Sequence, residues 1–275
     1  MSKVRPSLFA VAAANLCMMA CTEQRHEVPV EPPVQFQRVS ADTVSHGKRI
    51  ADVLGCTGCH GSDLTGEDWS EPGFGKLWTA NLTRAVPRYS DEQLVRIIKE
   101  GARPDRDLWE MPSHLFTHLT NDDMAALVAF LRTQPPTGPV RPEPVFEEGA
   151  RQEIAAGTFT SSRAQVKEKA TVWPPDVGRD HAVGRYIVRG TCAECHGLDL
   201  RGGQPHAQAK PRPDLRMVAA YDLEQFKRLL RTGKAAGDRE LTLMSDVARG
   251  RYKHLTDTEV EAIHRYLQKV AEAAS

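Results

Sequence analysis

The chain has 275 residues, a length that suits two small domains better than one large domain. Its 36 lysine and arginine residues balance 36 aspartate and glutamate residues, and no long block of like charge occurs, so a nucleic-acid-binding function is not expected. Any charged partner would be recognised by a local patch rather than by the field of the whole molecule.

The amino terminus has the layout of a secretory signal. Lys3 and Arg5 precede an apolar stretch from Leu8 to Ala20, which is too short for an ordinary membrane span. We therefore predict a signal peptide over residues 1–20. The protein is expected to be exported to the periplasmic side of a bacterial membrane.

A cysteine follows this leader directly. Met18-Met19-Ala20-Cys21 resembles a lipoprotein cleavage box, so we expect Cys21 to be lipidated and residues 21–42 to form a proline-containing tether. The alternative is ordinary cleavage near Ala20. Such cleavage would discard Cys21 or leave it exposed, and an exposed thiol in an oxidising compartment would be unusual, which favours the lipid.

Two pentapeptides of the form CxxCH carry most of the functional information. They are Cys56-Thr57-Gly58-Cys59-His60 and Cys192-Ala193-Glu194-Cys195-His196. In such a motif the two thiols attach haem covalently and the histidine binds its iron, so we predict two haem c groups. A redox dithiol, a zinc site or an iron–sulfur site would leave both histidines without a role.

The sequence around each motif is repeated in the same order. Residues 89–101 align without a gap on residues 221–233, and both segments have the apolar spacing of a helix. Capping signals agree with this prediction. Helix starts are indicated by Ser90 with Gln93, Thr120 with Asp123, and Thr256 with Glu259, and helix ends by Gly101 and Gly233.

Motif, order and spacing together resemble class I cytochrome c domains. The resemblance implies an all-α fold with two tandem haem domains, at residues 43–134 and 179–275. It also implies that Gly47 and Gly184 allow a close crossing with the last helix of each domain, near Phe130 and Tyr266. By the same resemblance, the carbonyl of Ala80 accepts the free N–H of His60, and the carbonyl of Pro213 accepts that of His196.

The second ligand of each iron must come from elsewhere in its domain. By the resemblance we expect Met111 and Met244, each in the irregular stretch between two helices, to complete His/Met coordination. His118 and His254 repeat between the copies, so bis-histidine coordination is the alternative. Surface positions are expected for the remaining candidates, His46, His181, His206 and His264.

Residues 135–178 separate the two copies and are rich in proline. We predict a connector, with a short helix between Arg151 and Ala170 and no packed third domain.

These features predict a dihaem cytochrome that transfers single electrons outside the cytoplasm. The pattern resembles cytochrome subunits of periplasmic or membrane-bound dehydrogenases, which implies a dehydrogenase donor and an oxidase or another cytochrome as acceptor. An enzymatic role is not expected, because both axial positions of each iron would be occupied. The alternatives are a dihaem peroxidase, a sulfur-compound oxidoreductase or a haem-based sensor, each of which needs one open iron.

Overall fold

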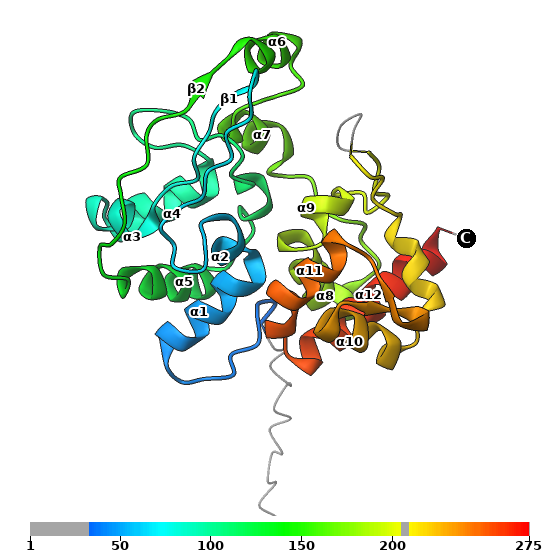
Figure 1. The fold of residues 1–275 in the computed structure, drawn as a ribbon. Coiled ribbons are helices and arrows are strands. Elements are labelled where there is room, and N and C mark those ends of the chain that lie inside the picture. Colours follow the sequence, from blue (N-terminus) through cyan, green and yellow to red (C-terminus); the bar gives the residue numbers. More distant parts are fainter. Residues whose placement is uncertain (1–32, 205–208, 275) are drawn as a thin grey trace, which may run out of the picture. The chain divides into compact units, whose positions relative to one another are not determined.

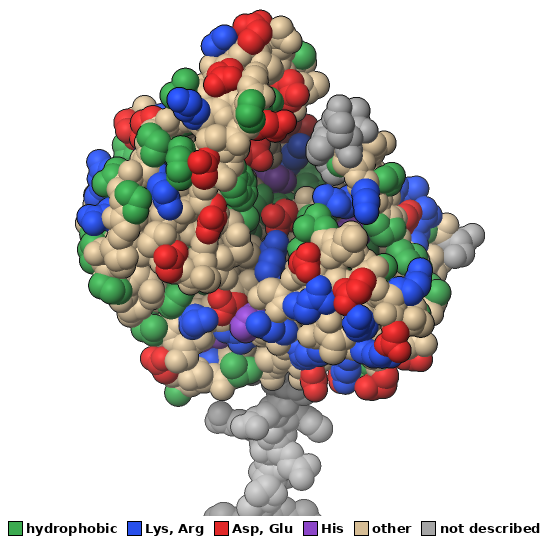
Figure 2. All heavy atoms as spheres, in the orientation of Figure 1, with side chains coloured by type: hydrophobic (Ala, Val, Ile, Leu, Met, Phe, Trp, Pro, Cys, Tyr) green, Lys and Arg blue, Asp and Glu red, His purple; other side chains and the backbone are tan. Residues whose placement is uncertain are grey.

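Two helical domains and the segment between them make up the part of the chain that the computed structural model describes, residues 33–204 and 209–274 (Figure 1). Residues from Val34 onward belong to one compact unit. None of the helices in the described ranges is long and apolar enough to cross a membrane. Basic and acidic side chains are interspersed over the face shown in Figure 2.

The first domain is built around the crossing of α1 and α5. Gly47 of α1 lies against α5, where an added Cβ would meet the backbone of Ala126 and approach the Cβ of Phe130 to 3.0 Å. Only a glycine permits this distance, so the predicted close crossing is confirmed. The elements of this domain are α1 (Thr43–Leu54), α2 (Cys56–Cys59), β1 (Gly75–Lys76), α3 (Leu82–Ala85), η1 (Val86–Arg88), α4 (Asp91–Glu100), η2 (Ser113–Leu115) and α5 (Asn121–Arg132).

The second domain repeats this arrangement with α8 and α12. Gly184 of α8 meets α12 at Ala262 and Tyr266, where an added Cβ would lie 2.6 Å from the Cβ of Tyr266. The elements of this domain are η3 (Arg179–His181), α8 (Ala182–Gly190), α9 (Ala193–His196), η4 (Leu215–Ala220), α10 (Leu223–Thr232), β3 (Lys234–Ala235), η5 (Ala236–Asp238), β4 (Arg239–Glu240), α11 (Leu243–Gly250), η6 (Tyr252–His254) and α12 (Asp257–Ala273).

Helix ends form where the capping signals predicted them. Ser90 and Gln93 make a reciprocal capping box at the start of α4, and Thr256 and Glu259 do the same for α12. Thr120 caps α5 through the backbone N–H of Asp123. Gly101 ends α4 and Gly233 ends α10, both in the left-handed conformation.

Residues 135–178 are more ordered than the predicted connector with one short helix. They contain β2 (Val145–Phe146), which pairs antiparallel with β1, and two helices, α6 (Glu148–Ala156) and α7 (Ser162–Lys169). Aromatic rings hold this segment to the first domain: Trp109 lies 4.7 Å from Phe146 and 4.9 Å from Phe159, measured between ring centroids. The segment therefore forms a strap over the first domain.

The two domains contact each other through corresponding residues. Arg49, two residues after Gly47, binds the Glu259 carboxylate with both terminal nitrogens at 2.7 and 3.1 Å. Tyr186, two residues after Gly184, donates to the Asp123 carboxylate at 2.7 Å. Each domain thus uses its first long helix to reach the capped start of the other domain's last helix, which makes the contact nearly two-fold symmetric.

The end of the predicted tether is packed at this contact. The Phe36 ring is fully buried, and its centroid lies 5.8 Å from that of Tyr186. The backbone N–H of Phe36 donates to Asp123, while that of Gln37 donates to Glu259. Residues 36 and 37 therefore connect the Asp123 and Glu259 carboxylates at the starts of α5 and α12.

Candidate functional site

The first CxxCH motif follows α1 through a single left-handed residue. Gly55 ends α1 with φ of 85°, and α2 then brings Cys56 and Cys59 to i and i+3 on one face of a helical turn. The Nδ1 atom of His60 lies 2.8 Å from the carbonyl oxygen of Ala80. Because a carbonyl can only accept, Nδ1 must carry the proton, which leaves Nε2 with a free lone pair for a metal.

The second motif repeats this geometry on α9. The Nδ1 atom of His196 lies 2.8 Å from the carbonyl oxygen of Pro213. Both predicted histidine–carbonyl hydrogen bonds are therefore present. Burial lowers the pKa of His60 and of His196, so both rings are neutral near pH 7 and available as ligands.

The thiols do not have the character of a reactive dithiol. Burial raises the pKa of Cys56 to about 12 and that of Cys192 to about 11. A redox-active CxxC cysteine has a lowered pKa, because its thiolate must be populated at neutral pH. This difference disfavours the dithiol alternative for both motifs.

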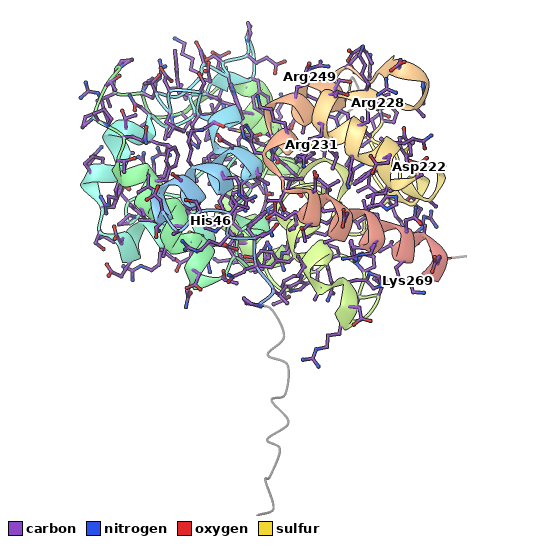
Figure 3. All side chains as sticks on the ribbon, turned by 90° about the horizontal axis from the view of Figure 1, so that it is seen from below. His46, Asp222, Arg228, Arg231, Arg249 and Lys269 are labelled. Carbon is purple, nitrogen blue, oxygen red and sulfur yellow. The ribbon has the colours of Figure 1, made fainter. Side chains whose placement is uncertain are left out.

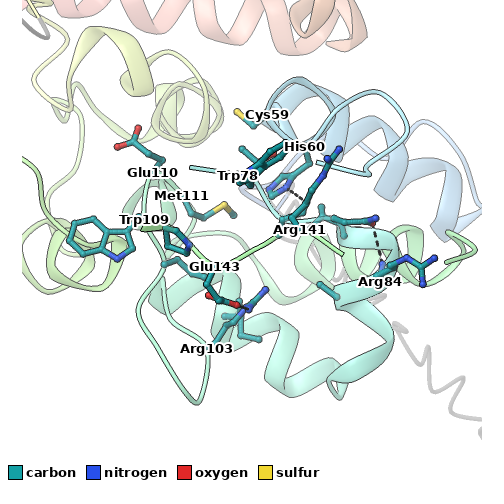
Figure 4. Close-up of a pocket in the computed structure, with 18 of the residues that line it drawn as sticks. Cys59, His60, Trp78, Arg84, Arg103, Trp109, Glu110, Met111, Arg141 and Glu143 are labelled. Carbon is teal, nitrogen blue, oxygen red and sulfur yellow. Dashed lines mark hydrogen bonds and ion pairs between the residues drawn. The ribbon is translucent and has the colours of Figure 1, made fainter. Parts of the chain in front are cut away.

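A cavity of about 360 Å³ opens beside the first motif, a volume within the range of about 300–1,000 Å³ typical of small-molecule sites. Cys59, His60 and Met111 line it, together with apolar residues that include Leu82 and Leu94. In Figure 4 the Met111 side chain directs its sulfur atom into the cavity, toward the side on which His60 lies. An imidazole, a thioether, two thiols on one helical face and an apolar wall are the groups that a covalently attached haem requires.

Arginines supply most of the charged side chains of this cavity, in which Glu143 also pairs with Arg103 and Arg106. Arg84, Arg88, Arg103, Arg106 and Arg141 are among the residues that line it. Arg141 belongs to the strap, donates to the carbonyls of Thr65 and Gly66 at 2.9 and 2.5 Å, and lies 4.7 Å above the Trp78 ring. A haem carries two carboxylates, and fixed guanidinium groups are suited to binding them.

The contribution of Arg141 was missed in the sequence. It lies in the proline-rich stretch that was interpreted as a connector, and no repeat or periodic pattern marks it. Its role becomes visible only when the strap folds back over the first domain.

The loop that carries Met111 is supported by a buried arginine from the second domain. The Nη2 atom of Arg189 donates to the carbonyls of His114 and Ala170 at 3.0 and 2.8 Å, and to the Thr117 hydroxyl at 2.9 Å. Its guanidinium also lies 4.4 Å from the centroid of Trp173. Arg189 is therefore well placed to fix the position of the loop after Met111.

Met244 lies in a different local structure from the one predicted. It is the second residue of α11, not part of an irregular stretch, and it packs half-buried against the core of the second domain. The next residue of this eight-residue helix, Ser245, turns its hydroxyl inward and donates to the carbonyl of Gly233 at 2.5 Å. Met111, in contrast, lies in the predicted irregular stretch between α4 and η2.

The repeated histidines serve the contact between the domains. The Nε2 atom of His118 lies 2.9 Å from the carbonyl oxygen of Tyr186, and its ring packs against the Tyr186 ring at 4.6 Å. His254 has its Nδ1 atom 3.9 Å from the Asp52 carboxylate of the first domain. Both imidazoles therefore face the other domain.

Two further histidines were wrongly expected at the surface. His46, labelled in Figure 3, is buried with its Nε2 atom 3.5 Å from Asp123, and His264 is buried with Nε2 at 2.8 Å from the Tyr221 carbonyl. Both are drawn inward because they lie on the apolar faces of helices. Cys21, most of the tether and His206 lie outside the described residues.

The two motifs lie close together. A second, smaller cavity of about 60 Å³ is lined by Cys56, Cys59, His60 and Met111 of the first domain and by Glu194 of the second motif. A residue of the second motif therefore borders the first attachment site.

Comparison with known proteins agrees with this geometry. The model of the family described as cytochrome c matches twice, at residues 44–135 and 182–271, which together cover well over half of the chain. The chain is 26% identical over 296 residues to the fructose dehydrogenase cytochrome subunit of Gluconobacter japonicus, covering 96% of this chain and 59% of that protein. It is also 26% identical over 263 residues to a diheme cytochrome c-type protein of Cereibacter sphaeroides, covering 82% and 85% of the two chains.

A third relative is the cytochrome c subunit of an alcohol dehydrogenase (quinone) from Gluconacetobacter polyoxogenes. It is 23% identical over 258 residues, which cover 81% of this chain and 54% of that subunit. The chain thus spans little more than half the length of the two dehydrogenase subunits.

Proposed function

Because this chain belongs to the cytochrome c family and contains two domains of it, we propose that it carries single electrons from a periplasmic dehydrogenase to a terminal acceptor. Cys56 with Cys59, and Cys192 with Cys195, bind two haem c groups covalently, and the chain has the electron-transfer role of its family. The names of two relatives support the dehydrogenase donor. The observation that carries the proposal is the paired motif whose histidines are both oriented by a backbone carbonyl.

We assign the iron ligands as His60 with Met111 and His196 with Met244. When bound, each haem supplies an iron that cycles between ferric and ferrous states. The protein holds the two ring nitrogens with their lone pairs free, and Met111 provides a thioether in the cavity that His60 also lines. With His60, Met111, His196 and Met244 as ligands, neither iron would offer a site for substrate, which is the reason for proposing a carrier rather than an enzyme.

The location proposed for this transfer is the periplasmic side of a bacterial membrane, with the lipid on Cys21 as the anchor. The leader pattern before Cys21 supports export. Cys21→Ser is expected to move the haem-containing protein from the membrane fraction to the soluble periplasmic fraction. Retention of the variant in the membrane fraction would show that another contact anchors the protein.

The donor is tested with the full chain expressed in its own bacterium and purified in mild detergent. We expect a dehydrogenase to remain bound and the haem absorbance to change to the reduced spectrum when the substrate of that dehydrogenase, a sugar or an alcohol, is added. A preparation whose haems stay oxidised with every substrate that its co-purifying dehydrogenase accepts would contradict the proposed donor.

A further inference from the structure

One arginine lies between the two haem-attachment motifs. Arg251 follows α11 in the second domain, and its Nη2 and Nε atoms donate to the carbonyls of Leu54 and Val53 in the first domain, at 2.9 and 3.3 Å. These carbonyls end α1 directly before the first motif. The guanidinium packs so closely over Gly55 that an added Cβ there would lie 2.6 Å from the central carbon of the guanidinium.

The same guanidinium binds the second motif. Its Nη1 atom lies 2.7 Å from the carboxylate of Glu194, one of the two residues between Cys192 and Cys195. Glu194 also lines the small cavity beside Cys56, Cys59 and Met111. One side chain of the second domain therefore contacts both attachment turns, and its acidic partner borders the first haem site.

This ion pair differs from the ion pairs of the surface. The side chains of Arg251 and Glu194 are 12% and 25% exposed, whereas those of Arg249, two residues earlier in the chain, and its partner Asp246 are 43% and 72% exposed. Charges shielded from water act on their surroundings more strongly, because the effective dielectric constant is lower. The ion pair between Arg49 and Glu259 holds the two domains together near this site.

We propose that Arg251 is a positioning residue that fixes the two haem-attachment motifs against each other, and that the Arg251–Glu194 pair couples the two haems electrostatically. The coupled step is an internal one: one ferrous haem is oxidised, the ferric haem of the other domain is reduced, and no bond or proton changes place. This role is independent of the donor, because it concerns transfer within the chain.

The charges predict opposite shifts in reduction potential. Arg251→Met removes a positive charge that favours the ferrous state and is expected to lower the potentials, whereas Glu194→Gln removes a negative charge and is expected to raise them. We expect each change to alter the reduction equilibrium of at least one haem by about threefold or more, which is about 30 mV for a one-electron couple. The matched control is Arg249→Met, whose exposed charge, labelled in Figure 3, is expected to shift either potential by less than half as much.

The double variant Arg251→Met with Glu194→Gln distinguishes the positioning role of Arg251 from the electrostatic role of the ion pair. Its net charge at the bridge matches that of the native pair, so we expect its potentials to return close to the native values. We follow electron equilibration between the two haems of this double variant after rapid photoreduction of the holoprotein. We expect it to be at least tenfold slower than in the native protein. Equilibration at the native rate would overturn the positioning role.

The electrostatic role is overturned if Glu194→Gln leaves both potentials unchanged. This single variant decides that question even where Arg251→Met fails to fold, because glutamine matches glutamate in shape and Glu194 is partly exposed. Haem content and circular dichroism establish that each variant is intact. Shifts of opposite sign in the two single variants are a readout that a merely structural contact would not produce.

Discussion

Removing one hydroxyl group tests the contact between the two haem domains. The hydroxyl of Tyr186 donates to the buried Asp123 carboxylate at 2.7 Å and accepts from the Thr120 backbone N–H at 3.0 Å. Tyr186→Phe deletes a hydrogen bond to a charged group, worth about 1.5–3 kcal/mol, and leaves a backbone donor unpaired at a further cost of about 1 kcal/mol. The expected loss of unfolding free energy is therefore about 3 kcal/mol.

Tyr266→Phe is the matched control. Tyr266 is equally buried, but its hydroxyl makes one neutral hydrogen bond, to the Pro175 carbonyl at 2.9 Å, so the expected loss is about 1 kcal/mol. At about 2–4 °C per kcal/mol, Tyr186→Phe should lower the melting temperature by about 6–12 °C and the control by about 2–4 °C.

The assay is thermal unfolding of the holoprotein, followed by haem absorbance and by circular dichroism. If haem absorbance and circular dichroism report the same transition, unfolding is two-state and the shift in melting temperature can be converted to a change in the free energy of unfolding. The reasoning is refuted if Tyr186→Phe is no more destabilising than Tyr266→Phe. That result would mean that the contact between Tyr186 and Asp123 contributes no more than an ordinary neutral hydrogen bond.

Two further outcomes follow from glycine packing and from histidine burial. Gly47→Ala is expected to lower the free energy of unfolding by more than about 3 kcal/mol and to lower haem content, because its Cβ would overlap the α5 backbone. Gly250→Ala is the control and should be neutral, because there is open space around Gly250. Equal melting temperatures for the two variants would contradict the close crossing of α1 and α5. Burial, followed by the charge of Arg189, lowers the pKa of His118 to about 4, whereas the unfolded chain has its usual pKa of about 6.5. The unfolded state therefore binds the extra proton first, so stability should fall as the pH decreases from about 6.5 to 4, and His118→Gln should flatten the dependence of melting temperature on pH in this window. An unchanged slope in the variant would assign that dependence to other groups.

Local features of the fold were predictable because they depend on nearby residues. The capping boxes at Ser90 and Thr256 and the left-handed glycines at Gly101 and Gly233 are set within a few positions of each other. The crossings at Gly47 and Gly184 and the carbonyl partners of His60 and His196 followed from the resemblance and are present in the structure.

Contacts between distant segments were not predictable in the same way. In the sequence Arg49 looks like an ordinary surface charge and Glu259 like a capping residue, and only the packing of the two domains buries them together. The strap contains Phe146 and Phe159 without a regular period, so nothing in the chain indicates that they pack on Trp109. The helix that holds Met244 forms around an inward-turned Ser245, which is likewise a tertiary contact.

The most direct test of the central claim is the optical spectrum of the purified holoprotein, oxidised and reduced, with and without carbon monoxide. Two His/Met haems predict low-spin spectra, a methionine-to-ferric-iron charge-transfer band at the intensity of two haems, and no response to carbon monoxide. Met111→Ala and Met244→Ala should each remove half of that band. A high-spin or carbon-monoxide-binding haem in the native protein would contradict a closed electron carrier and would indicate an open iron.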